Sequence, residues 1–299
     1  MIKKLGMRQQ QWLWAYVFLL PWIIGFLVFT AGPMVTSLWL SFHKGDFVSV
    51  EYVGLENYRR LFTEDPLFWK SLNVTILYAV IAVPLGIAGS LGLAMLLNTK
   101  VKGIPLFRTL FYLPSLVPAV ATAVLWQWLF NTDNGLLNQI LGFFGFIGPQ
   151  WLQDEKWTLP GFIIMSLWGI GGGRMVIFLA GLQGIPESYK EAAMLDGAGP
   201  KMIFRHVTLP LLSPVVFFNV VLGIIGTFQY FTQAYVMTGG GPNNASLFYA
   251  LYLFRNAFEY FKIGKASAMA WVLFAVLLII TAIQFGLSKR WVHYEGEKA

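Results

Sequence analysis

Long apolar segments alternate with shorter polar and charged segments along most of this 299-residue chain. A helix needs about 20 consecutive apolar residues to cross the roughly 30 Å hydrocarbon core of a bilayer. Six segments reach that length. We therefore expect an all-α membrane protein with six transmembrane helices, within a single domain that covers residues 1–299. The expected spans are approximately 13–33, 73–97, 109–130, 159–183, 209–237 and 266–287.

The composition supports a membrane protein. Hydrophobic residues make up 57% of the chain and charged residues only 12%, against about 25% charged residues in a soluble domain. The first apolar segment follows Lys3, Lys4 and Arg8, as a signal peptide would. However, it is longer than a signal-peptide core, and residues 29–33 make a poor cleavage site. We expect a helix that is retained in the membrane lipid.

The distribution of Lys and Arg predicts the orientation of the chain. Twelve of the 21 Lys and Arg residues lie in the two terminal segments and in the connections after the second and fourth spans. Eight lie in the longer connections on the other side. Because cytoplasmic loops are enriched in Lys and Arg, we expect cytoplasmic N- and C-termini and a cytoplasmic segment 184–208. Arg174, the remaining one, falls inside a span.

Several classes of function lack support in the sequence. The net charge of +7 comes from basic residues at the ends of spans, which indicates topology and not nucleic-acid binding. The chain has no cysteine, and its three histidines are not at ligand spacing, so we expect no metal site and no cofactor. We find no acid, base and nucleophile constellation, and no Gly-x-x-x-x-Gly-Lys-Ser/Thr motif for ATP. We expect a non-catalytic protein.

One polar and charged segment, residues 184–208, lies between two apolar spans. We expect two short helices, with Pro186 at the first helical position, Glu187 in the first turn and Gly197 as a left-handed residue after the helix. Small side chains and carboxylates there suit the docking of another protein. The candidate contact residues are Glu191, Ala192, Ala193, Asp196 and Gly197. An amphipathic helix that lies at the lipid headgroups is the alternative.

This segment resembles a known motif. Glu-Ala-Ala at 191–193, Asp-Gly-Ala at 196–198 and Leu-Pro at 209–210 are similar to the EAA loop of permease subunits in binding-protein-dependent ABC importers. Val-Gly-Leu-Glu-Asn-Tyr at 53–58, Leu-Pro-Ser-Leu-Val-Pro at 113–118 and Thr-Gly-Gly-Gly-Pro at 238–242 resemble the carbohydrate branch of that family. The pattern is most similar to the first permease subunit of maltose, multiple-sugar and glycerol-3-phosphate importers.

The resemblance implies a type I ABC importer permease fold in a bacterial or archaeal cytoplasmic membrane. It implies a second permease subunit, two ATPase subunits that hydrolyse ATP and dock at the EAA loops, and an extracytoplasmic solute-binding protein. One departure is the first outer loop, which is short here, whereas the maltose-type subunit has a large insertion. The receptor would then dock on residues 131–156, which include Trp151, and on 239–265. These two segments are otherwise plain connections between helices.

Helix breakers interrupt several spans. The main ones are Pro84, Pro114, Pro118, Pro214 and the glycines at 171–173. They free backbone groups that lipid cannot satisfy, so they should face other helices or a watery cavity. Such positions suit a translocation path, although proline and glycine also shape ordinary packing in membrane helices.

Arg174 is the main candidate for substrate binding. An ionisable residue inside a span costs roughly 2.5–3.5 kcal/mol on insertion scales and usually faces the interior of the bundle. Trp168 and the glycines before Arg174 leave room beside an indole ring. An aromatic face and an arginine suit a polar, ring-shaped ligand. The alternatives are that Arg174 caps a broken helix or extends to an interface.

Further candidates come from the resemblance to the maltose-type subunit. Gln229 and Tyr230 match its polar pair in the sugar site, and Ser115 with Gly171 or Gly172 matches other lining positions. The fifth span also brings Gln233, although polar side chains there often only bridge helices. The expected substrate-binding residues are thus Ser115, Trp168, Gly171, Gly172, Arg174, Gln229, Tyr230 and Gln233.

These features predict the permease subunit of an ATP-driven sugar importer. The aromatic residues favour a neutral oligosaccharide, and Arg174 leaves an acidic sugar or a glycerol-phosphate-like solute as the alternative. An ion-coupled secondary transporter is a further alternative. It would more often carry Asp, Glu or His inside a span, and none lies well inside a span here.

Overall fold

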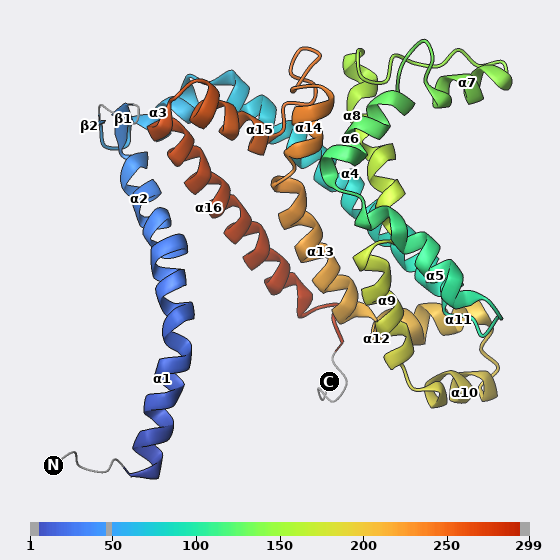
Figure 1. Ribbon diagram of the computed structural model, residues 1–299. Coiled ribbons are helices and arrows are strands. Elements are labelled where there is room, and N and C mark those ends of the chain that lie inside the picture. Colours follow the sequence, from blue (N-terminus) through green and yellow to red (C-terminus); the bar gives the residue numbers. More distant parts are fainter. Residues whose placement is uncertain (1–5, 46–49, 294–299) are drawn as a thin grey trace. The chain divides into compact units, whose positions relative to one another are not determined.

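The computed structural model describes residues 6–45 and 50–293 and is mostly helical (Figure 1). The chain divides into two compact units. Unit 1 comprises Met1–Glu64 and Leu253–Val272, and unit 2 comprises Asp65–Tyr252 and Leu273–Ala299. That the whole chain acts as a single domain stays a prediction.

Unit 1 begins with one long helical segment, Met7–Ser41, made of α1 (Met7–Phe26), a π-helical turn (Leu27–Ala31) and α2 (Gly32–Ser41). The π turn lies just before Pro33, where the usual backbone donor is missing. There the Gly32 N–H bonds to the Leu27 carbonyl, five residues back. The helix thus continues past the proline, and it is longer at both ends than the expected span 13–33.

A short β-ribbon follows, so the all-α expectation misses a small element. Strands β1 (His43–Gly45) and β2 (Val50–Tyr52) pair antiparallel, and α3 (Glu56–Thr63) comes next. Asn57 Nδ2 donates to the carbonyls of Ser41 and His43, each at 2.8 Å. The Tyr58 hydroxyl donates to Ser41 Oγ at 2.7 Å. The motif at 53–58 therefore fixes this loop to the end of α2.

The C-terminal part of unit 1 contains a second π turn and the start of α16. The π turn spans Arg255–Glu259, and α16 (Ile263–Ser288) runs on into unit 2. Trp271 Nε1 donates to Ser37 Oγ of α2 at 3.1 Å. Residues far apart in the sequence are thus joined within this unit.

Unit 2 is organised around α4 (Pro66–Leu97), which packs against α8 (Glu155–Leu167), α9 (Gly173–Gly184) and α13 (Ser213–Phe228). Asp65 caps the start of α4 by accepting from the backbone N–H groups of Leu67 and Phe68. Helix α4 stays continuous through Pro84. It is the longest unbroken helix of this unit, and the three helices named above pack against it (Figure 1).

The other spans of unit 2 are interrupted. Helices α5 (Ile104–Tyr112) and α6 (Ala119–Leu129) meet at a 3-10 turn, Leu113–Leu116, with a bend of 94°. Helices α8 and α9 meet at the turn Trp168–Gly171 with a bend of 45°. Residues 229–231 separate α13 from α14 (Thr232–Met237). The expected helix breakers at Pro114, Pro118 and 171–173 thus coincide with real breaks.

Short elements complete unit 2. They are α7 (Leu136–Phe143), α10 (Glu187–Leu195), α11 (Pro200–Ile203), a π turn (Phe204–Thr208), α12 (Leu209–Leu211) and α15 (Tyr249–Phe254), which reaches into unit 1. Within the described residues, four helices are long and apolar enough to cross a membrane: Met7–Ser41, Pro66–Leu97, Ser213–Met237 and Ile263–Ser288. The two bent pairs raise the number to as many as six.

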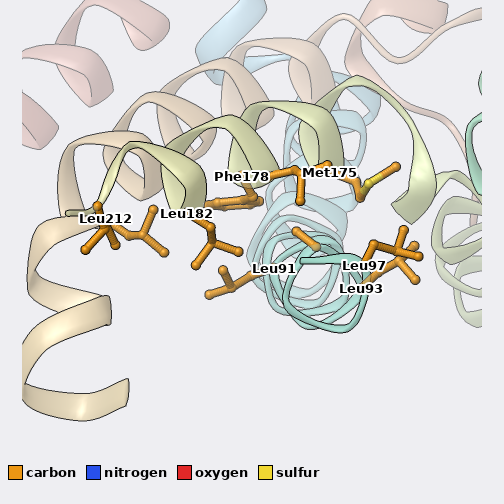
Figure 2. Close-up of a cluster of buried hydrophobic side chains, with 10 residues drawn as sticks. Leu91, Leu93, Leu97, Met175, Phe178, Leu182 and Leu212 are labelled. Atoms are coloured by element: carbon orange, nitrogen blue, oxygen red, sulfur yellow. The ribbon is translucent and has the colours of Figure 1, made fainter. Parts of the chain in front are cut away.

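A hydrophobic cluster joins α4 to α9 (Figure 2). Phe178 and Leu182 of α9 point toward Leu91 of α4, and Leu212 closes the cluster beside Leu182. Gly181 brings α9 close to the start of α13, because an added Cβ would lie 2.9 Å from Leu212 Cδ2. Close packing holds these helices together, since lipid provides no hydrophobic drive for helix association.

We predict that Phe178→Ala destabilises unit 2. Phe178 is fully buried, and a cavity left by a buried phenylalanine costs about 3–5 kcal/mol. Denaturant unfolding of the purified chain in detergent measures the loss. Phe18→Ala on α1 is the control, because Phe18 is 78% exposed and its loss should change the free energy of unfolding by only about 0.5 kcal/mol. Equal losses in both variants would contradict the assigned core.

Candidate functional site

A cavity of about 240 Å³ lies between α4, α8, α9 and α13 in unit 2. Its lining residues are Tyr78, Ala82, Val83, Gly86, Ser166, Gly169, Arg174 and Thr227. The cavity adjoins the break between α8 and α9, where Ser90 Oγ of α4 donates to the Ile170 carbonyl at 2.7 Å. The carbonyl freed by the break is therefore satisfied by a neighbouring helix, as a membrane interior requires.

Arg174 is the charged residue of this cavity. Its guanidinium lies against two glycines on separate helices. A Cβ added to Gly86 would meet Nη1, and one added to Gly223 would lie 3.3 Å from Nη2. Gly86 therefore makes room for the guanidinium, and Gly223 makes room for both the guanidinium and Val83, whose Cγ1 would lie 3.0 Å from the added Cβ. The side chain is directed into the unit, between α4 and α13.

The guanidinium has no carboxylate partner within the part of the chain that the structure describes. The ion pairs found there involve Arg59, Arg60, Lys100 and Arg255 with glutamates, and none involves Arg174. Arg174 is also in the first turn of α9, where the helix dipole disfavours a positive charge. The positive charge of Arg174 therefore does not stabilise the start of α9 as a helix cap would.

An aromatic group forms one side of the cavity. The Tyr78 ring lies 5.0 Å from the Tyr230 ring and 5.2 Å from the Phe248 ring, centroid to centroid. Phe162 meets Tyr230 and Phe248 edge-to-face at 6.0 and 5.7 Å. These rings hold Tyr78, the aromatic residue of the cavity lining, in place.

The sequence predicted eight substrate-binding residues, and the structure places them in three groups. In the first group, Arg174 lines the cavity and Tyr230 contacts the lining residue Tyr78. The second group lies outside the cavity lining. Gln229 is exposed at the end of α13, and Gln233 is half-buried in the first turn of α14. Trp168 is 36% exposed and meets Trp126 edge-to-face at 6.1 Å, outside the cavity lining.

The third group consists of residues at which two helix breaks pack together. A Cβ on Gly171 would collide with the Phe111 carbonyl, and one on Gly172 would lie 3.0 Å from Ser115 Cβ. Ser115 Oγ donates to the Tyr112 carbonyl at 2.7 Å. In this structure the three residues lie at the contact between the two breaks and do not line the cavity.

The sequence analysis did not select most of the residues that line the cavity. Tyr78, Ser166 and Thr227 supply hydroxyls from three different helices. Thr227 lies two residues before Gln229, which the sequence did predict. Tyr78 and Ser166 are polar residues within apolar spans, and this feature alone indicates a role in a binding site only weakly. Gly86 and Gly223 gave no signal, because their role depends on a contact with Arg174.

The segment 184–208 forms two helices, as expected. Gly197 has φ +81°, its N–H bonds to the Met194 carbonyl at 3.0 Å, and the Ala198 N–H bonds to the Ala193 carbonyl at 2.9 Å. This pair of bonds is a Schellman motif. One detail differs from the expectation: Pro186 precedes the helix and Glu187 is its first residue.

Helix α10 is open to solvent, with no buried residue. Leu195 is 90% exposed and Met194 61% exposed. Glu191, Ala192, Asp196 and Gly197 are exposed, and Ala193 is half-exposed. Lys100 pairs with Glu187 at 3.1 Å, but both side chains are largely exposed, so the pair contributes little to stability. The predicted contact residues are thus accessible to another protein.

Two polar pockets lie at the end of α8 that is away from the break. One, of about 510 Å³, is lined by Gln127, Phe130, Asn131, Thr132, Leu152, Gln153, Met237, Thr238, Gly241 and Pro242. The other, of about 480 Å³, shares Gln153 and Pro242 and adds Gln150, Asp154, Glu155, Lys156 and Asn243. The loop 238–246 that borders them is held by Ser246 Oγ, which donates to the Gly241 carbonyl at 2.7 Å.

Comparison with known proteins identifies relatives along almost the whole chain. The Bacillus subtilis (strain 168) probable ABC transporter permease protein YesP is 45% identical, with 95% of this chain and 93% of that protein aligned. The Rhizobium radiobacter lactose transport system permease protein LacF is 34% identical, with 90% and 92% aligned.

A solved structure has the same fold. A chain of a bacterial alginate ABC transporter, crystallised in complex with an alginate pentasaccharide-bound periplasmic protein, gives a TM-score of 0.83 at 23% identity over 94% of this chain and 95% of that one. A family model also matches residues 82–293. This chain belongs to the family of binding-protein-dependent transport system inner membrane components, the multi-pass membrane permeases of ABC importers.

Proposed function

We propose that this chain is the permease subunit of an ATP-driven, solute-binding-protein-dependent sugar importer and forms half of the translocation path. The observation that carries the proposal is the pair of short helices on either side of Gly197. The first of them, α10, is exposed, follows α9 closely and is ended by a Schellman motif. The relatives named above are ABC permeases, and one of them transports lactose. Sugar is therefore the proposed class of substrate.

The partners follow from the proposal. The chain has no ATP-binding motif of the P-loop type, so separate ATPase subunits supply the energy. One ATPase docks on residues 184–208 of this chain, which we call the coupling segment. The other docks on the coupling segment of a second, different permease. The crystallised alginate transporter was in complex with a periplasmic protein, and an extracytoplasmic receptor would likewise deliver substrate here.

The orientation is part of the proposal. The excess of Lys and Arg puts the coupling segment and both termini in the cytoplasm of a bacterial or archaeal cell. In this orientation the two polar pockets at 127–156 and 237–243 face outward. They bring the two expected receptor-docking segments together and offer the receptor polar, hydrogen-bonding surface. The six spans would comprise the four long helices and the two bent pairs.

The geometry suggests how ATP closure acts on the substrate site. Only Ile185 and Pro186 separate α10 from α9. A displacement of α10 would therefore be transmitted to α9, because no flexible linker lies between them. Helix α9 has 12 residues and is about 18 Å long. Arg174 lies at its far end. Movement of the coupling helix would therefore displace the charged group of the cavity, as alternating access requires.

The proposed site residues have different roles. Arg174 contacts substrate, with hydroxyls from Tyr78, Ser166 and Thr227 beside it. Tyr230 supports Tyr78 through ring contact. We keep Gln229, Gln233 and Trp168 as contacts for a substrate that extends out of the cavity. Ser115, Gly171 and Gly172 allow the two helix breaks to pack and move together.

We predict that the tagged chain, purified from its native membrane in mild detergent, brings down a P-loop ATPase and a second permease, identified by mass spectrometry. Leu195→Ala should weaken recovery of the ATPase about tenfold if Leu195 anchors the interface, because truncation of an anchor residue costs more than about 1 kcal/mol and about 1.4 kcal/mol is a tenfold change in affinity. Leu55→Ala is the control, since Leu55 is 67% exposed and lies outside the coupling segment. A chain that purifies alone would contradict the proposal.

We predict that Gly197→Pro leaves the membrane helices folded but abolishes the coupling of ATP hydrolysis to transport. Proline fixes φ near −65° and lacks the N–H that bonds to Met194, so the Schellman motif cannot form. Gly197→Asn should retain most coupling, because asparagine tolerates the left-handed region. Substrate-stimulated ATPase activity and uptake in proteoliposomes measure the effect, and gel filtration checks assembly. Equal coupling in the two variants would remove Gly197 from this role.

A further inference from the structure

We propose that the substrate of this importer carries an oxyanion, and that Arg174 binds it in the cavity between α4, α8, α9 and α13. The inference rests on the proposed function and specifies its substrate as an acidic sugar. The aromatic residues in the sequence favoured a neutral oligosaccharide. The surroundings of Arg174 in the structure favour an acidic one.

The first argument is the missing counter-ion. Arg174 is half-buried, and a charge that is partly removed from water is usually paired, because desolvation is costly. Every helix that packs around Arg174 presents only uncharged groups to the cavity: Tyr78 from α4, Ser166 from α8 and Thr227 from α13, with small or apolar residues between them. Within the described residues, no ion pair involves Arg174. The cavity thus holds a positive charge that an anionic ligand would neutralise.

The second argument is the cradle that holds the guanidinium. Gly86 and Gly223 lie inside helices, where glycine costs about 0.5–1 kcal/mol relative to alanine. At both positions an added Cβ would approach a guanidinium nitrogen, Nη1 at Gly86 and Nη2 at Gly223. Two glycines on different helices therefore keep Arg174 in place inside the unit. An arginine without an interior function would need no such space.

The third argument is the match in chemistry and size. Guanidinium presents N–H donors in a planar fork that binds a carboxylate or phosphate through two hydrogen bonds. The positive end of the α9 dipole lies beside Arg174 and adds to the attraction. The cavity volume of about 240 Å³ is below the range of about 300–1,000 Å³ for whole small-molecule ligands. It would therefore take the acidic end of a saccharide. The Ser166 and Thr227 hydroxyls donate to backbone carbonyls of their own helices, so their oxygens would accept hydrogen bonds from the sugar hydroxyls.

The test uses the complete importer in nanodiscs and three probes: digalacturonate, its carboxyl-reduced neutral form, and glucose 6-phosphate. Binding is measured by calorimetry without receptor, so the selectivity of the receptor does not enter. The wild-type importer should bind an acidic probe at least tenfold more tightly than the neutral disaccharide. Preference for digalacturonate would identify a carboxylate, and preference for glucose 6-phosphate would identify a phosphate ester.

Arg174→Gln should reduce the preference for the acidic probe to about twofold or less, because glutamine keeps hydrogen bonding but loses the charge. Arg174→Lys should give an intermediate preference, because it keeps the charge but loses the planar fork. Arg59→Gln is the matched control, since its side chain is 69% exposed and makes only a long surface ion pair. The control should keep the preference of the wild type.

A second variant leaves the arginine in place. Gly86→Ala puts a methyl group where Nη1 lies, so the guanidinium must shift, and the affinity for the acidic probe should fall about three- to tenfold. Gly92→Ala on the same helix is the control, because an added Cβ there meets no atom within 4 Å. Equal acidic affinities in the two variants would contradict the cradle.

Three results overturn the proposal. They are a wild-type importer that binds none of the acidic probes, a preference that survives Arg174→Gln, and an Arg174→Gln variant that only fails to assemble. In the last case Arg174 pairs with a carboxylate of the second permease. If the first of these results is found and the importer takes up neutral sugars with ATP, the proposed function stays intact. A chain without ATPase partners would refute the proposed function itself.

Discussion

The structure depends on one constraint: backbone polar groups inside a membrane must find partners within the protein. The break between α8 and α9 frees such groups, and it is tolerated because Ser90 on α4 donates to the Ile170 carbonyl. Helix α4 supplies this partner because it is itself unbroken from Pro66 to Leu97. A continuous helix thus allows its neighbours to be interrupted, and a cavity forms where they are interrupted.

The glycines of unit 2 serve this arrangement in different ways. Gly171 and Gly172 let two helix breaks touch through backbone atoms, and Gly86 and Gly223 make space for a guanidinium. Gly197 instead supplies a left-handed residue that ends α10 and turns the chain. The same residue type therefore has three physical roles, namely close backbone approach, space for a side chain, and positive φ. The sequence predicted the left-handed role of Gly197 but did not distinguish the other two roles.

The sequence predicted the broad fold because apolar length and glycine position are local signals. It located the six apolar segments, the breaks at Pro114 and at 171–173, and the left-handed residue at Gly197. It placed the end of the first span at residue 33, whereas the helix runs to Ser41, because hydropathy records lipid-like composition and not the end of a helix. The neighbours of Arg174 could not be predicted, since Tyr78, Ser166 and Thr227 come together only through packing of three helices.

Packing also determines where this molecule can move. The cluster around Phe178 joins α9 to α4 and to Leu212, so α9 cannot slide freely past α4 without breaking close contacts. The helices are interrupted at the turn Trp168–Gly171 and at residues 229–231 between α13 and α14, and a change in their relative positions would require the least loss of helical hydrogen bonds there. The cavity adjoins the first break directly, and Thr227 lies just before the second. A ligand that bridges α9, α4 and α13 therefore acts on the relative positions of these helices. It can shift the conformational equilibrium only by as much as its affinities for the two arrangements differ. The proposed contact with Arg174 would contribute to that difference, because Arg174 lies on α9 next to the first break.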